Sequence, residues 1–201
     1  MTKNRLETFS DGVFAIVITL LILEIRIPVV DKAMLNHSLI QIIPKILSFI
    51  LSFIIIGSYW VAHHTMMDFL EKVDRSVLWL NLITLLTVAF IPLPTALLGE
   101  YPSERMPVIL YGISLSCVNI SGVLFWKFIT HKNRFVKQNL AVGFSRFVIF
   151  IHLLPVLFYL LAIALSYISI TLSYVIYISV PLFFIVPNSR IEKRLDTAYN
   201  K

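Results

Sequence analysis

An acidic residue stands near the start of an apolar stretch, where a charge is costly unless it has a partner. Asp11 follows Ser10 and precedes an apolar run that extends to Leu23. A carboxylate costs about 2.5–3.5 kcal/mol at the centre of a membrane helix and less near its ends, so it usually faces protein or water. Ser10 or Asp11 could instead cap free backbone N–H groups at a helix N-terminus. Both interpretations place the two side chains at the beginning of a helix.

The same stretch has an apolar face that carries a single hydroxyl group. At about 100° per residue, one arc about 100° wide holds seven residues, and Asp11 points away from it. These residues are Phe9, Gly12, Ile16, Thr19, Leu20, Leu23 and Ile27. A hydrophobic gate requires such a stripe, but a lipid-facing helix has the same pattern. Periodicity alone leaves both possibilities open.

Four further ionisable positions could bind ions or protons. His63 and His64 are adjacent, so on a helix they point about 100° apart and chelate one metal ion poorly; hydrogen bonding is the expected role. Glu24 lies near the outer end of the first apolar stretch. Several copies of it could form a cation-attracting ring, or it could pair with Arg26 or stay solvated. His152 is expected to donate a hydrogen bond between helices.

The composition requires a membrane around most of the chain. Hydrophobic residues make up 58% and charged residues 14% of the 201 residues, against roughly 45–50% and about 25% in soluble domains. Several apolar runs approach the roughly 20 residues that cross a bilayer. We therefore predict an all-α, polytopic integral membrane protein over residues 1–187, with a basic cytoplasmic tail over 188–201. Its six expected transmembrane helices are Phe9–Ile27, Leu39–Ala62, Val77–Leu98, Met106–Ile129, Leu140–Leu165 and Tyr167–Val186.

The basic residues are distributed unequally between the two sides of this topology. The outer segments hold only Arg26, Lys32, Lys45 and Arg105, while most other Lys and Arg residues fall in the inner segments. The positive-inside rule therefore predicts that both termini are cytoplasmic. The net charge of +6 is thus a topology signal, which could also touch anionic lipid, and no nucleic-acid partner is expected.

Three motifs in order resemble those of one family. They are Arg5-x-x-x-Phe9-Ser10-Asp11 with the following Ala15–Leu21, then Gly57–His64, and then Phe90–Glu100. These segments resemble the first, second and third helices of the transmembrane protein 175 family, which comprises endolysosomal potassium channels of animals and their bacterial relatives. The resemblance covers the first half of the chain, and the six-helix layout agrees for the remainder.

The resemblance implies roles for individual residues. It places Ile16 at the gate of a pore lined by the first helix of each subunit, Thr19 in a hydroxyl layer, and Leu20 and Leu23 in the next aliphatic layers. All four belong to the stripe described above. The motif residues would hold the pore helix against its neighbours, and the candidates for this network are Arg5, Phe9, Ser10, Asp11, His63 and His64, with Trp60 and Asn81 beside them.

The function implied by the resemblance is a potassium-permeable cation channel. A chain with one copy of the motif resembles the bacterial members, which are homotetramers in the cell membrane, and no cofactor is expected besides the permeant K⁺. The sequence lacks a Thr-Val-Gly-Tyr-Gly filter, so a leak-type pore with modest selectivity for K⁺ over Na⁺ is expected. A secondary transporter, a proton-leak pathway and a partner-binding membrane protein remain alternatives. An enzyme is not expected, because no motif pairs a nucleophile with a base.

Overall fold

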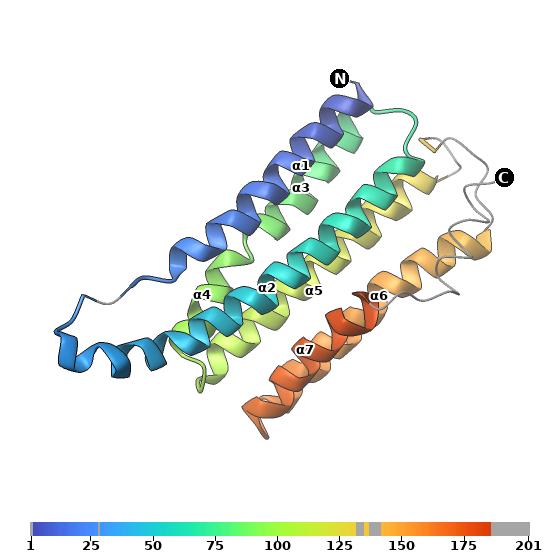
Figure 1. Ribbon diagram of the computed structural model, residues 1–201. Helices are drawn as coiled ribbons and strands as arrows, with labels where there is room; N and C mark the ends of the chain where they lie inside the picture. Colours follow the sequence, from blue (N-terminus) through green and yellow to red (C-terminus); the bar gives the residue numbers. More distant parts are fainter. Residues whose placement is uncertain (1, 28, 132–134, 137–141, 186–201) are drawn as a thin grey trace.

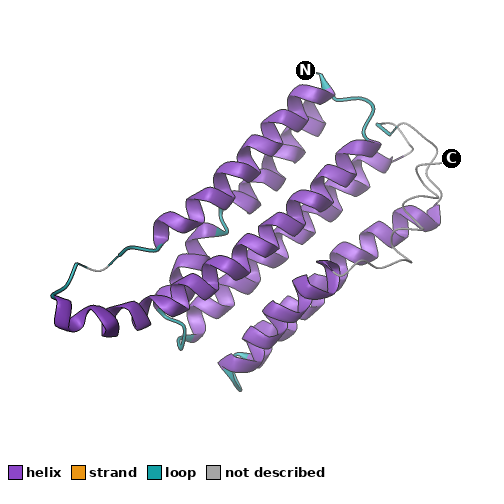
Figure 2. Cartoon of the chain, in the orientation of Figure 1, coloured by secondary structure: helices purple, strands orange, loops and turns teal. Residues whose placement is uncertain are grey.

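The regular structure of the described residues is helical. The computed structural model describes residues 2–27, 29–131, 135–136 and 142–185, and Figure 2 shows their helices and connections. Apolar segments form helices in a bilayer because the helix satisfies its own backbone hydrogen bonds. The elements are α1 (Lys3–Leu20), the short 3₁₀ helices η1 (Leu21–Glu24) and η2 (Lys32–Met34), α2 (Leu35–Phe69), α3 (Arg75–Ala89), α4 (Pro92–Glu100), α5 (Arg105–Thr130), α6 (Val142–Leu165) and α7 (Ile170–Ile185).

Five helical stretches are long and apolar enough to cross a membrane, and a sixth is shorter. The five are Lys3–Glu24, Lys32–Phe69, Arg75–Glu100, Arg105–Thr130 and Gly143–Leu165, and the shorter apolar helix is Ile170–Phe183. The six-helix prediction is confirmed in type and order. Its boundaries were wrong at several ends, most clearly in the second span, which extends well beyond Leu39–Ala62. The basic tail predicted for residues 188–201 lies outside the described residues.

Helix α5 is at the centre of the bundle and α1 is at its edge. Over an apolar stretch of 18 residues in each span, 67% of residues are buried in Arg105–Thr130, which is α5, and 28% in Lys3–Glu24, which contains α1. Helix α1 packs on α2 and α3, while α5 contacts α3, α4, α6 and α7. Successive spans run in opposite directions, so the N-terminus lies at the same end as the connection between α2 and α3 (Figure 1). This arrangement leaves one side of α1 without a partner among the described residues of its own protomer.

Two prolines divide the third span. Helix α3 ends at Ala89, and α4 begins at Pro92 with Pro94 close behind. Proline lacks a backbone N–H and is therefore accepted in the first turn of a helix but disrupts its interior. Pro155 and Pro181 lie inside the continuous helices α6 and α7.

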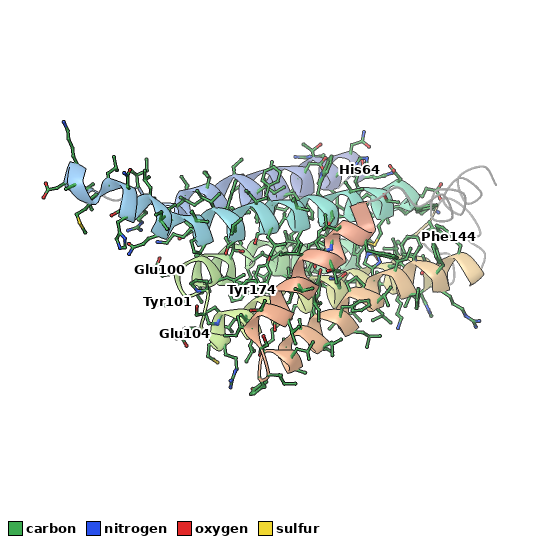
Figure 3. All side chains as sticks on the ribbon, turned by 60° about the horizontal axis from the view of Figure 1, so that its bottom comes forward. His64, Glu100, Tyr101, Glu104, Phe144 and Tyr174 are labelled. Carbon is green, nitrogen blue, oxygen red and sulfur yellow. The ribbon has the colours of Figure 1, made fainter. Side chains whose placement is uncertain are left out.

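A close contact between α2 and α4 lies at the end of the protomer opposite the N-terminus (Figure 1). Lys45 forms an ion pair with Glu100, and a Cβ added to Gly99 would lie 2.9 Å from the Cα of Lys45. Only glycine therefore permits this approach without a shift. Glu100, Tyr101 and Glu104 lie together at this end, whereas His64 and Phe144 lie toward the opposite end (Figure 3).

Candidate pore helix and its supports

The side chains of α1 divide between a buried face and an exposed face. The buried face comprises Leu6, Ser10, Phe14 and Val17, each 4% exposed or less, and continues with Leu21 in η1. The exposed face contains most of the stripe predicted from the sequence: Phe9 is 48%, Ile16 58%, Leu20 44% and Leu23 68% exposed, and Gly12 and Thr19 are also exposed. The stripe therefore points away from the core of the protomer.

The end of this stripe differs from the prediction. The last turn of the first span, Leu21–Glu24, is a 3₁₀ helix, and Ile27 lies beyond it in irregular structure. Three residues complete a turn in a 3₁₀ helix, so the 100° spacing used for the sequence does not extend to Ile27. Leu23 remains exposed, and Ile27 does not belong to a helical face.

The hydroxyl of Thr19 bonds to its own helix. Its Oγ1 lies 2.9 Å from the carbonyl oxygens of both Ala15 and Ile16. A carbonyl can only accept, so the hydroxyl hydrogen points back to the backbone. The remaining lone pairs of this oxygen are available on the exposed face, where a cation could meet them.

A buried chain of hydrogen bonds joins α1 to α3 and α2. Asn81 Nδ2 donates to Ser10 Oγ at 3.0 Å, and Ser10 Oγ donates to the carbonyl oxygen of Leu6 at 2.9 Å. The other end of the Asn81 amide, Oδ1, lies 2.8 Å from Nε2 of His63. An amide oxygen only accepts, so Nε2 of His63 carries the hydrogen. All three linked side chains are buried, and each would leave an unsatisfied group if its partner were removed.

Two aromatic rings enclose His63. The ring of Phe14 lies 5.4 Å away and that of Phe125 6.2 Å away, between centroids. The chain of hydrogen bonds is therefore surrounded by apolar groups from α1 and α5. Low polarity strengthens a satisfied hydrogen bond and penalises a missing one.

Asp11 has a separate partner on α2. Trp60 Nε1 donates to its Oδ1 at 2.9 Å, and the ring of His64 lies 5.9 Å from the Trp60 ring. Trp60 and His64 are exposed, so this contact lies at the rim of the α1–α2 interface. A hydrogen-bond partner on another helix, rather than capping of α1, is what the structure shows for Asp11.

Two predicted network residues lie apart from these contacts. Arg5 is exposed and makes no ion pair within the described part of the chain. Phe9 lies on the exposed face of α1. Among the described residues of one protomer neither joins the polar network, because both project from the exposed side of α1. Their role in such a network stays a prediction.

Glu24 borders a cavity at the end of the protomer that holds Lys45 and Glu100. The cavity, of about 210 Å³, is also lined by Lys45 and Glu100, which pair with each other. Within the described residues Glu24 has no ion pair, so the pairing with Arg26 that the sequence left open is not observed. The same residues contain no group of three metal-ligating side chains.

The sequence did not indicate that Phe14 and Phe125 lie beside His63. An apolar residue in a membrane helix carries no signal of which polar group it covers. Asn81 and Trp60 were candidates only because they are polar residues in apolar segments, and their actual partners depend on how the helices are rotated and shifted.

Comparison with known proteins decides the family. Residues 5–92 match the family described as "Endosomal/lysosomal potassium channel TMEM175". A protein of Chryseobacterium sp. (strain P1-3), named potassium channel HX13_20290, is 35% identical over 97% of this chain and 98% of its own length. The chain belongs to the TMEM175 family.

A solved structure and an animal relative extend this assignment. The crystal structure of a lysosomal potassium-selective channel TMEM175 homolog from Chamaesiphon minutus superposes with a TM-score of 0.79 at 33% identity, over 90% of this chain and 95% of the other. The endosomal/lysosomal proton channel TMEM175 of Gallus gallus is 35% identical over 59% of this chain but only 25% of its own length. The TMEM175 fold is thus shared along most of the chain with bacterial relatives.

Proposed function

We propose that this TMEM175 member is a potassium-permeable cation channel in the bacterial cell membrane, and that four copies surround a pore lined by α1. The observation that carries the proposal is the exposed stripe of α1, together with the channel names of the relatives. A single helix cannot enclose a pore, so the exposed faces of several α1 helices must meet around an axis. The positive-inside distribution of charge supports cytoplasmic termini.

The gate in this proposal is a ring of Ile16 side chains. Ile16 is 58% exposed in the protomer and has no polar atom beyond its backbone. A narrow apolar ring holds little water, so an ion meets a dewetting barrier until the helices separate or rotate. Leu20 and Leu23 extend this constriction toward the outer end.

Selectivity would come from the width of the ring and from the Thr19 oxygens. Because each Thr19 hydrogen is directed to the backbone, four oxygens facing the axis present lone pairs that replace part of a hydration shell. No carbonyl filter fixes the spacing of these oxygens, so modest preference for K⁺ over Na⁺ is expected. Glu24, which forms no ion pair with another described residue, would attract cations at the outer mouth.

The buried contacts of α1 are its scaffold in this proposal. Ser10, Asn81 and His63 hold the rotation of α1, and Asp11 with Trp60 holds its inner end. Neither group of contacts faces the exposed stripe. The supports can therefore be changed separately from the pore surface.

The test is K⁺ flux into liposomes that contain the purified protein, with and without the change Ile16→Asn. A polar ring holds water and lowers the barrier, so we expect a K⁺ flux at least about tenfold above that of the unchanged protein, which corresponds to about 1.4 kcal/mol of barrier. Ile83→Asn is the matched control, because Ile83 is 50% exposed on α3. An unchanged flux in the first variant, or an equal rise in both, would refute the gate.

A proton pathway is the second candidate, favoured by the name of the animal relatives. The same liposomes distinguish it: an internal pH indicator reports proton entry under a voltage when no K⁺ is present. A secondary transporter would instead give saturating flux coupled to a second ion.

A further inference from the structure

A larger cavity lies between α2, α5, α6 and α7, away from α1. Its volume is about 420 Å³, within the roughly 300–1,000 Å³ of small-molecule sites, which often lie between the helices of bundles. It is partly open to the surface of the protomer. Ser10, Asp11 and the exposed stripe of α1 do not line it, so it is separate from the proposed pore.

The walls of this cavity are mainly apolar and rich in rings. Phe69 from α2, Trp126 from α5 and Phe147 from α6 contribute flat aromatic surfaces, and Pro155 and Pro181 contribute rings from α6 and α7. Flat rings pack well against other rings in stacked or edge-on arrangements. The shape and chemistry of the walls favour an aromatic occupant over a flexible polar one.

One acceptor on the wall receives no hydrogen bond from any residue that the structure describes. Asn119 is 4% exposed, and its Nδ2 donates to Tyr59 Oη at 2.8 Å and to the Leu115 carbonyl at 2.9 Å. Since a carbonyl only accepts, these bonds fix the orientation of the amide. No described residue donates to Asn119 Oδ1, and every fully buried side-chain polar atom among the described residues has a partner. This oxygen therefore keeps some exposed surface, and Asn119 is one of the residues that line the cavity.

A second acceptor comes from α6. His152 Nδ1 lies 3.0 Å from the Val148 carbonyl, so Nδ1 carries the hydrogen and Nε2 of the neutral ring presents a lone pair. The expected bond between helices was wrong, because the partner is one turn earlier in the same helix. The ring packs against Gly122, where an added Cβ would lie 3.0 Å from His152 Cδ2. Glycine at this position lets α6 bring the ring to the cavity wall.

The two acceptors define what the cavity attracts. Asn119 Oδ1 and His152 Nε2 are both the negative ends of dipoles, so they repel an anion and attract the positive hydrogen of a neutral donor. We propose that this cavity binds a phenol-type amphiphile dissolved in the bilayer, whose hydroxyl donates to Asn119 or His152 and whose ring packs among the aromatic walls. One hydroxyl on an apolar body satisfies the acceptor without leaving a polar group of the ligand unpaired.

The experiment uses the full chain in lipid nanodiscs and a photoreactive para-alkylphenol as the probe. Labelled peptides are identified by mass spectrometry, with para-butylphenol or its methyl ether, para-butylanisole, as competitor. The ether has the same ring but no donor. Loss of one net hydrogen bond lowers the binding affinity by a factor of about 3–10. The phenol should therefore compete at a concentration lower than that of the ether by about this factor.

Two variants locate the site without disturbing its polar atoms. Ala62→Phe fills the cavity that Ala62 lines, and we expect it to reduce labelling about tenfold or more. Ala89→Phe adds the same ring at an exposed position on α3 and should leave labelling unchanged. Equal competition by phenol and ether, labelling spread over other helices, or full labelling of Ala62→Phe would overturn the proposal. Labelling of a second copy across this cavity would also overturn it, because another chain would then be the occupant.

Discussion

The two faces of α1 are both apolar, but among the described residues of the protomer only one of them has neighbours. Phe14 and Val17 pack in the core, whereas Ile16 and Leu20 point away from it. The buried face carries the linked polar residue, Ser10, and the exposed face carries bulky aliphatic side chains. In a membrane the polar residue marks the face that contacts protein, because lipid cannot satisfy its hydrogen bonds.

The largest expected difference between the two faces is in stability. Phe14 is 2% exposed and lies against the His63 ring. Phe14→Ala should therefore lower the free energy of unfolding by about 3–5 kcal/mol. In the detergent-solubilised protein this corresponds to a fall of roughly 10 °C in the melting temperature. Ile16→Ala on the other face should cost less than about 1 kcal/mol, since it removes few contacts. Equal losses in the two variants would contradict this division of α1.

The second prediction concerns the hydrogen bonds that hold the buried face of α1 against its neighbours. Asn81→Leu leaves Ser10 and His63 without their partner and should cost about 1–3 kcal/mol. In a double-mutant cycle with Ser10→Ala, the coupling energy should reach about 0.6–1.7 kcal/mol. Thr19→Val serves as the control, because the Thr19 hydroxyl bonds only within its own helix and should change stability by less than about 0.5 kcal/mol. Strictly additive losses would show that Ser10 and Asn81 act independently.

Much of this division was accessible from the sequence. The spacing of Ile16, Thr19 and Leu20 placed them on one face, and Asp11 pointed away from it, as the structure shows. The same periodicity could not identify which of the two apolar faces was buried, because both are made of Phe, Val, Ile and Leu side chains.

Hydrogen-bond partners were the part that the sequence could not supply. Ser10 and Asn81 are 71 positions apart, and their contact depends on the rotation and shift of α1 and α3. The turn Leu21–Glu24 and the cavity beside Asn119 also gave no signal. A 3₁₀ turn has no composition of its own here, and the cavity arises from residues on four helices, none of which forms a motif.

A smaller loss of stability is expected when Asp11, at the rim between the two faces of α1, is replaced. The carboxylate of Asp11 accepts from Trp60 near the surface, so Asp11→Ala should cost about 1 kcal/mol, less than a buried charge-assisted bond. Because Asp11 does not belong to the exposed stripe, the ratio of K⁺ to Na⁺ flux should change less than about twofold, a difference below about 0.4 kcal/mol. The measurements are the yield of assembled protein by size-exclusion chromatography and paired ion fluxes in liposomes. A large change in selectivity together with normal assembly would contradict this role and indicate that Asp11 contributes to the pore surface.

The most direct test of the account asks whether the exposed face of α1 contacts the permeating ion. Cys117 is the only cysteine, so Cys117→Ser gives a background free of thiols, into which Ile16→Cys, Leu20→Cys or Leu23→Cys is introduced. Ag⁺, which enters cation pores and reacts with thiols, should abolish K⁺ flux in these variants and leave the background and Ile83→Cys unaffected. Flux that survives Ag⁺ at all three α1 positions, or that is lost at Ile83→Cys instead, would contradict a pore lined by α1.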